Sequence, residues 1–207
     1  MNPSARSFLL PWLLACALPA TAQDLASFEK QVTYNTLANG LRVIVVEAKG
    51  APVFSFSTRV MTGSDREVLG ITGLAHMFEH MAFKGTDVIG TTNYAAEKAA
   101  LARVETAYAA YDTARRRPGR DDKKVADLEK AFKAAVAEAD AFVVKNEFGE
   151  IVDREGGVGL NASTNADETQ YYYSLPANRF ELWAYLESER FLKPVMREFY
   201  KERDVVN

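Results

Sequence analysis

A proline–glycine break divides the middle of the chain into two segments of strongly helical composition. Residues 95–117 and 122–144 are rich in Ala, Lys, Glu and Arg, and Pro118-Gly119 between them cannot continue a helix. Apolar residues recur every three or four positions along both segments, so each has a stripe that the other can bury. We therefore expect two antiparallel helices, inserted as a hairpin at about residues 98–150. Its charged faces are typical of solvated surface, and we assign the hairpin no chemistry.

The part of the chain that precedes this hairpin has the patterns of two or three β-strands. Residues 31–37 and 41–46 are rich in β-branched and apolar side chains, and Asn39-Gly40 between them favours a tight turn. Residues 53–61 alternate between apolar and polar side chains, the period expected of a strand. The sequence therefore predicts a β-hairpin followed by a third strand.

Shorter helical patterns flank a second strand-forming region. Leu74, Phe78 and Met81 recur at helical spacing before a glycine at position 85, and a last helix is expected from about residue 178, with another helical turn after Pro194. Between them, residues 160–175 are strand-prone. We therefore predict an α+β fold, in which an antiparallel or mixed sheet has helices packed on one face and carries the inserted antiparallel helical hairpin.

Composition excludes several classes of protein. The 207 residues are 48% hydrophobic and 26% charged, as in globular proteins, and the net charge of −3 leaves no basic field for a nucleic-acid backbone. We therefore expect no nucleic-acid partner. The only cysteine, Cys16, excludes an internal disulfide and a zinc ribbon, so a metal site must use histidines and carboxylates.

The first 22 residues have the features of a secretory signal peptide. Arg6 supplies a positive charge, residues 8–18 form a short apolar run, and residues 20–22 (Ala-Thr-Ala) form a small-x-small cleavage site before Gln23. An N-terminal membrane anchor is the alternative, but it would need roughly 20 apolar residues. Lipid attachment at Cys16 is a second alternative. We expect an exported chain, periplasmic or secreted, with no stable membrane span after cleavage.

The two histidines of the chain lie four residues apart, with a glutamate between them. On an α-helix, His76, Glu79 and His80 project within one arc of about 100°, so all three side chains face one point. Neutral imidazoles are good ligands for Zn²⁺, and a carboxylate beside the metal can move a proton. A pair of surface histidines with a helical Glu–His contact is the alternative. The spacing indicates half of a hydrolytic zinc site.

Further short motifs occur in order along the chain. They are Leu37-x-Asn39-Gly40-Leu41-x-Val43, Gly63-Ser64-x-x-Glu67, Gly73-Leu74-Ala75-His76-Met77-Phe78-Glu79-His80-Met81-x-Phe83-Lys84-Gly85-Thr86, Asn161-Ala162-x-Thr164, Tyr172-Tyr173, Glu187-x-x-x-Phe191-x-x-Pro194 and Glu202-Arg203-Asp204-Val205-Val206. In order and content they resemble the amino-terminal half of the insulinase-like zinc peptidases, also called the pitrilysin or inverzincin family. The resemblance covers nearly all of residues 23–207, which we take as one metallopeptidase amino-terminal domain, except the hairpin.

The resemblance implies roles for individual residues. His76 and His80 match the two histidine ligands of zinc, and Glu79 matches the acid that activates the metal-bound water. Glu202 matches a glutamate that supports activity without binding the metal. In the family pattern the third ligand is a glutamate seven residues later, at position 209. As the chain ends at Asn207, we expect a fragment that lacks this ligand, binds zinc weakly and is inactive alone.

The resemblance also implies a substrate-binding strand. Asn161, Ala162 and Thr164 match an edge strand that holds an extended substrate in the family, in agreement with peptide capture at exposed sheet edges. A plain turn into a core strand is the alternative for these residues. Residues 171–173 (Tyr-Tyr-Tyr) favour sheet packing over ligand contact.

The function expected from this resemblance is that of a zinc-dependent endopeptidase domain, which hydrolyses peptides or unfolded proteins through metal-activated water. The family usually closes a chamber from two such halves, so a second homologous half-domain or subunit is implied as a partner. The alternative is a catalytically silent peptide-binding or assembly subunit of the same fold, or an inactive fragment.

Overall fold

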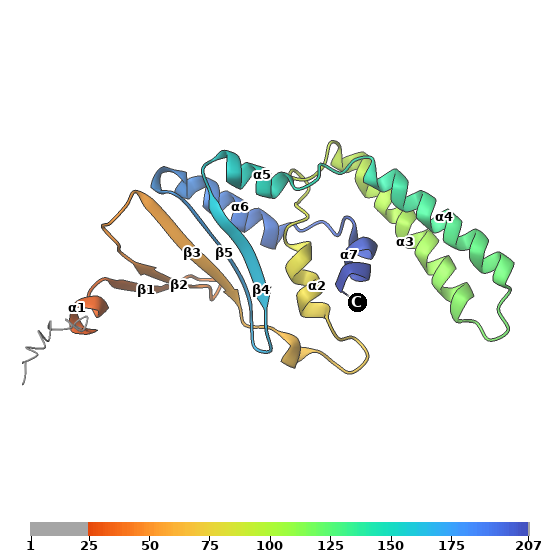
Figure 1. The fold of residues 1–207 in the computed structure, drawn as a ribbon, viewed down its shortest axis with the longest axis horizontal. Helices are drawn as coiled ribbons and strands as arrows, with labels where there is room; N and C mark the ends of the chain where they lie inside the picture. The colour runs from red at the N-terminus through yellow and green to blue at the C-terminus, as the bar shows by residue number, and fades with distance from the viewer. Residues whose placement is uncertain (1–24, 207) are drawn as a thin grey trace, which may run out of the picture. The chain divides into compact units, whose positions relative to one another are not determined.

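The computed structural model describes residues 25–206 (Figure 1), and the chain divides into two compact units between Ala51 and Pro52. The predicted signal peptide and its cleavage site lie outside the described residues. No helix within the described range is long and apolar enough to cross a membrane.

The first unit is the predicted β-hairpin, preceded by a short helix, α1 (Leu25–Glu29). Strands β1 (Val32–Thr36) and β2 (Arg42–Val46) pair in antiparallel register. Gly40 takes a left-handed conformation with φ of 86°, and the side chain of Asn39 accepts a hydrogen bond from the Leu41 amide at 3.1 Å. The Asn-Gly turn expected from the sequence is confirmed.

The second unit is built on a three-stranded antiparallel sheet of order β3-β5-β4. Its strands are β3 (Val53–Val60), β4 (Val158–Thr164) and β5 (Thr169–Pro176). Along the central strand β5 every second residue, from Thr169 to Leu175, is buried, so one face of the sheet supports the core. Strand β4 lies at an edge of this sheet.

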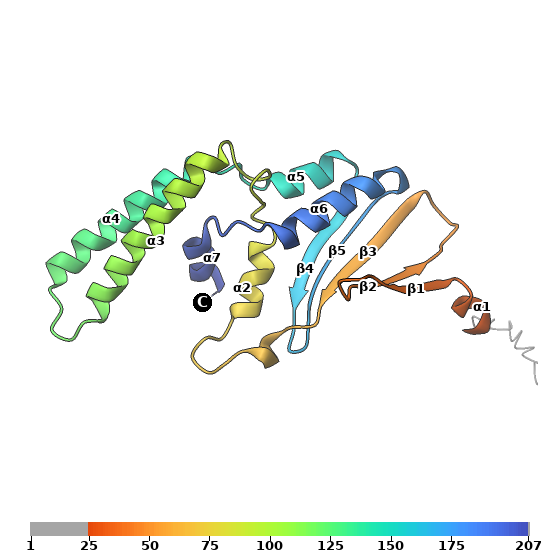
Figure 2. The same ribbon diagram turned by 180° about the vertical axis from the view of Figure 1, so that it is seen from behind.

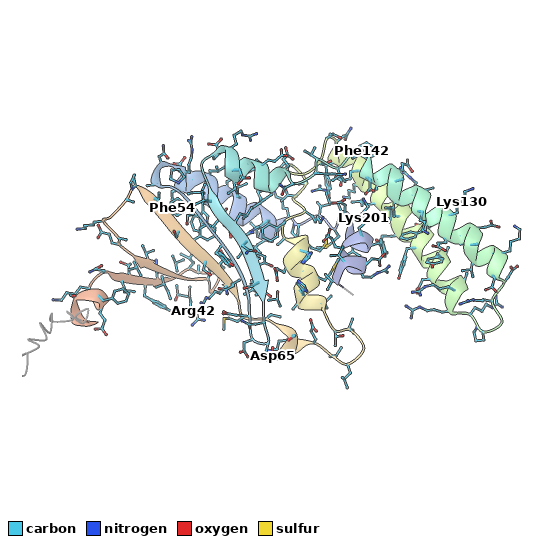
Figure 3. All side chains as sticks on the ribbon, viewed as in Figure 1. Arg42, Phe54, Asp65, Lys130, Phe142 and Lys201 are labelled. Carbon is cyan, nitrogen blue, oxygen red and sulfur yellow. The ribbon has the colours of Figure 1, made fainter. Side chains whose placement is uncertain are left out.

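Helices cover the buried face of the sheet (Figure 2). Helix α6 (Phe180–Leu192) and helix α5 (Glu147–Arg154) pack there around one core cluster, which comprises Ile89, Phe148, Val152, Tyr173, Leu175 and Leu186. Phe54 of β3, labelled in Figure 3, packs against this cluster. The predicted α+β class with helices on one face of an antiparallel sheet is confirmed.

The inserted hairpin consists of helices α3 (Tyr94–Arg116) and α4 (Asp122–Asp140). The side chain of Asn93 caps α3 and that of Asp121 caps α4, each by accepting an amide hydrogen bond within the first turn. The apolar stripes bury each other around Ala100, Val104, Phe132 and Ala139. The predicted pair of helices is confirmed, and the chain reverses at Pro118-Gly119.

One local expectation was wrong. Helix α4 ends at Asp140 rather than 144, because the following residues return to the loop before α3, where Thr91 bridges Val143 and the Thr92 amide donates to the Phe142 carbonyl. The strand-prone stretch at 160–175 forms two strands, with a turn after Thr164.

Two short helices complete the second unit near the expected site. Helix α2 (Leu74–Met81) follows the sequence prediction, and helix α7 (Phe199–Val206) lies against it. A buried ion pair between Glu97 of α3 and Arg197 fixes the start of the hairpin to the segment that leads into α7.

Candidate metal centre

Helix α2 has one buried face, and a glutamate side chain caps the turn where the helix begins. Met77 and Met81 are buried, and Gly73 before the helix has φ of 87°, a left-handed conformation that favours glycine. The side chain of Glu67 accepts hydrogen bonds from the amides of Gly73 and Ala75, both at 2.8 Å. These amide donors, Ala75 first, lower the pKa of the Glu67 carboxyl. Glu67 therefore satisfies the open amides at the start of the helix that carries the histidines.

The imidazoles of His76 and His80 converge. Their Nε2 atoms lie 3.1 Å apart, and their rings stand at 81° to each other. Two nitrogens at 2.0–2.1 Å from a tetrahedral zinc ion would be about 3.3 Å apart, so the separation fits a shared ion. The sequence prediction that both histidines face one point is therefore matched by the arrangement of their rings.

The second nitrogen of His80 has a carboxylate partner from helix α7. Nδ1 of His80 lies 2.9 Å from Oε2 of Glu202. Because an ionised carboxylate only accepts hydrogen bonds, Nδ1 carries the proton and Nε2 keeps its lone pair for a ligand. At zinc sites, a ligand histidine usually donates its other ring N–H to a carboxylate. Glu202 is in this position, as expected for a glutamate that supports activity without binding the metal.

Glu202 is itself held by a lysine. Oε1 of Glu202 lies 2.5 Å from Nζ of Lys84, just past the end of α2. Burial alone would raise the pKa of Glu202, but the hydrogen bonds from Lys84 and His80 outweigh it and lower the pKa overall. Lys84 lies in the histidine motif, but its role could not be predicted from the sequence, because its partner Glu202 is 118 positions away in the chain.

Glu79, the predicted proton carrier, is buried and is held by a threonine of β4. Oγ1 of Thr164 donates to Oε2 of Glu79 at 2.5 Å. The same hydroxyl lies 3.1 Å from Oγ1 of Thr169, which donates to the carbonyl of Thr62. The hydroxyl of Thr164 has one proton, and it donates this proton to Glu79. The sequence analysis placed Thr164 on a substrate strand, and the structure adds a contact with Glu79.

A cavity of about 460 Å³ opens beside these side chains. Its walls include His76 and Glu79 on one side and residues 162–166 of β4 and the following turn on the other. Ala162 and Thr164 therefore lie at the cavity. Asn161 does not line it, and its side chain accepts a hydrogen bond from the Ala162 amide at 2.8 Å.

At every second residue of β4, the backbone N–H and C=O groups point away from β5, toward the free edge of the sheet. The amide of Ala162 donates to a side chain rather than to β5, and the amide of Asn165 turns inward to the carbonyl of Glu168. Because amide direction alternates along a strand, Ala162 and Thr164 present their backbone groups at the outer edge.

Tyr171 and Tyr173 on β5 are buried, and burial raises the pKa of Tyr171 to about 12. These two tyrosines pack in the sheet, as the sequence favoured.

The donor set within residues 25–206 fits zinc but is incomplete. His76 and His80 supply two neutral nitrogens, and no group of three His, Cys, Asp or Glu side chains in this range is arranged to hold a metal ion. Glu202 is bound to His80 and Lys84 instead. The third ligand predicted at position 209 stays a prediction.

Comparison with known proteins finds similarity to one family of peptidases. Residues 42–114, which include α2, match the family model described as insulinase, peptidase family M16. Among solved structures, a protease from Helicobacter pylori is similar, with 26% sequence identity and a TM-score of 0.54, over 84% of this chain and 29% of that protein. The chain thus spans less than a third of that protease. No curated protein matches it. The resemblance to the insulinase-like family is confirmed, and the chain has a peptidase-type fold.

Proposed function

We propose that this chain is the histidine-bearing domain of a zinc-dependent endopeptidase that hydrolyses peptides or unfolded proteins. One observation carries the proposal: the Nε2 atoms of His76 and His80 converge at 3.1 Å beside buried Glu79, at a cavity lined by a sheet edge. The family match and the similar protease support a peptidase.

His76 and His80 would hold the metal, together with a glutamate at position 209. When bound, zinc would supply the positive charge that acidifies a water molecule and polarises the carbonyl of the substrate. Glu202 keeps His80 in the tautomer whose Nε2 lone pair is free, by accepting a hydrogen bond from Nδ1–H.

Glu79 would move the proton. Its carboxylate lies on the cavity wall, where it can accept a proton from the attacking water and deliver it to the leaving amine. Thr164 holds Oε2 of Glu79 by its hydroxyl, so Oε1 is the oxygen available for this transfer. Holding one oxygen fixes the carboxylate plane and thereby the position of the other.

The substrate would be held as an extended strand along β4. Backbone groups of Ala162 and Thr164 at the outer edge can pair with a peptide backbone, which gives affinity with little dependence on side chains. To accept such a strand, the side chain of Asn161 must release the amide of Ala162. The proposed partners are therefore a peptide or unfolded protein and, from the family pattern, a second homologous half. Export to the periplasm or medium is part of the same proposal.

A catalytically silent peptide-binding subunit is the second candidate function. The cavity and the edge of β4 would serve it equally, but a silent subunit needs neither the convergent imidazoles nor a buried glutamate beside them. The two functions differ in whether the imidazoles bind zinc and whether Glu79 moves a proton, so changes at His80 and at Glu79 separate them.

The test compares three variants of a chain extended through a glutamate at position 209. Glu79→Gln should keep its zinc and lose peptide turnover at least about a hundredfold, the usual effect of a lost acid–base group. His80→Ala should lose zinc itself. Glu150→Gln on the exposed side of α5 is the control and should change neither. Zinc content and cleavage of a fluorogenic peptide are measured together. Full turnover by Glu79→Gln would refute the proposed proton transfer, and zinc retention by His80→Ala would refute the metal site.

A further inference from the structure

Helix α7, which carries Glu202, lies between the histidine helix α2 and the base of the inserted hairpin. It has only eight residues and no buried side chain. Helices this short are unstable in isolation, so the position of α7 depends on contacts from its neighbours. Toward α2, Glu202 of α7 is hydrogen-bonded to His80, and the contacts on the other side come from α3 and α4 of the hairpin.

An aromatic cluster joins α7 to the hairpin. The ring of Tyr200 lies 4.2 Å from that of Tyr108 on α3 and 5.1 Å from that of Phe132 on α4, between ring centroids. The hydroxyl of Tyr200 donates to Glu105 at 2.9 Å. Partial burial of Tyr200, reinforced by this hydrogen bond, raises the pKa of its hydroxyl, which therefore stays a donor at neutral pH. Tyr200 is thus seated in the apolar core of the hairpin base.

Two cationic side chains of α7 flank this ring and bind the hairpin. Nη1 of Arg203 donates to the hydroxyl of Tyr108 at 2.8 Å. Nζ of Lys201, a residue labelled in Figure 3, lies 2.6 Å from Oδ2 of Asp140 at the end of α4. Both helices of the hairpin therefore hold α7.

From Asp140 a continuous chain of ion pairs reaches the histidines. Lys201 also contacts Glu198 at 3.2 Å, and Glu198 contacts Lys84 at 3.0 Å. Lys84 binds Glu202, and Glu202 binds Nδ1 of the ligand histidine. Each step as far as Glu202 joins opposite charges, and the last step is a hydrogen bond from Nδ1 of His80 to Glu202, so one polar network links the hairpin to His80.

We propose that the base of the inserted hairpin is a positioning element of the metal centre, which holds α7 so that Glu202 keeps its contact with His80. The inference rests on the proposed function and deepens it. Tyr108 and Asp140 are the positioning residues, because they anchor α7 without reaching the histidines. The far half of the hairpin, around Pro118-Gly119, takes no part in these contacts.

The test uses two double variants matched in chemistry. Tyr108→Phe with Asp140→Ala removes two of the polar contacts between the hairpin and α7, leaves the hydrogen bond from Tyr200 to Glu105, and keeps the aromatic ring. Tyr111→Phe with Glu138→Ala is the control, because Tyr111 packs on Phe132 within the hairpin and Glu138 pairs with Arg103 of α3. Both are made in the whole chain, and unfolding by denaturant confirms that each is folded.

The first measurement needs no metal. Nitrogen NMR of the imidazoles reports which nitrogen of His80 carries the proton. In the parent chain and in the control we expect the proton on Nδ1, and in the Tyr108/Asp140 variant we expect a mixture of tautomers, because Glu202 is no longer held in place. A parent-like tautomer in the Tyr108/Asp140 variant would overturn the proposal.

The second measurement is zinc affinity by competition with a chelator. The Tyr108/Asp140 variant should bind zinc about 2- to 30-fold more weakly, the equilibrium effect of two partly exposed polar contacts, and the control should bind like the parent. In a Glu202→Gln background the same variant should have no further effect, because it acts only through Glu202. A purely structural role predicts an equal loss in both backgrounds and would contradict the proposal.

The two proposals fail in different ways. If His80→Ala binds zinc like the parent, the proposed metal site is wrong, whatever the NMR spectra show. If His80→Ala loses zinc while the Tyr108/Asp140 variant keeps parent affinity, the metal site stands and the role of the hairpin is refuted.

Discussion

Two buried glutamates of the second unit have opposite surroundings. Glu97 is completely buried and shares both carboxylate oxygens with the guanidinium of Arg197. Glu79 is 9% exposed, lies on a cavity wall, and has a threonine hydroxyl as its partner. Within residues 25–206, Glu79 takes part in no ion pair shorter than 4 Å with a basic side chain.

The difference separates a structural carboxylate from a reactive one. Arg197 also donates to the carbonyls of Lys84, Thr86 and Ile89, so its charge is fully used in closing the loop after α2. A carboxylate with both oxygens bound to a guanidinium is held as a structural anion and is poorly suited to accept a proton from water. Glu79 lines the cavity and is held by a neutral hydroxyl rather than by a cation, and this is the state that proton transfer needs.

The largest effect should be on stability. Glu97→Gln leaves the guanidinium of Arg197 buried without its counter-charge, and the free energy of unfolding should fall by about 3–5 kcal/mol. Glu79→Gln keeps the hydrogen bond from Thr164 and should lower the same free energy by less than about 1 kcal/mol. Denaturant unfolding of both variants measures the contrast. Equal losses would show that both glutamates are structural.

A smaller effect should appear at Thr164. Thr164→Val removes the hydroxyl that orients Glu79 and keeps the side-chain shape, so peptide turnover in the chain extended through position 209 should fall about tenfold with unchanged zinc affinity. Thr164→Ser retains the hydroxyl and is the matched control, with turnover close to the parent. If valine and serine give the same turnover, the contact between Thr164 and Glu79 has no part in the reaction.

The part of the site that lies on a single helix could be predicted from the sequence. His76, Glu79 and His80 lie within five consecutive positions of one helix, so helical geometry alone brings them together. Their supports come from far along the chain: Thr164 is 85 positions from Glu79, and Glu202 is 122 positions from His80. Residue patterns indicate which element forms, but contacts between distant elements depend on how the elements pack.

The same distinction explains the fold. The two long helices and the Asn-Gly hairpin carry their own periodicity and turn residues, and both were predicted correctly. Helix α5 was missed because its eight residues follow α4 after a short gap and were taken as the end of the hairpin. Two signals were present: acidic side chains in its first turn, and Phe148 and Val152 at helical spacing. The turn between β4 and β5 is also indicated in the sequence, by Asn165. Its side chain accepts hydrogen bonds from the backbone amides of Asp167 and Glu168.

The most direct measurement of the central claim is anomalous X-ray diffraction from crystals of the chain extended through a glutamate at position 209 and grown with zinc. The account predicts a zinc peak about 2.0–2.1 Å from Nε2 of both His76 and His80, with Nδ1 of His80 still bound to Glu202. His80→Ala crystals grown in the same way should show no peak there. Zinc bound at another place, or parent crystals without zinc between the two imidazoles, would contradict the account.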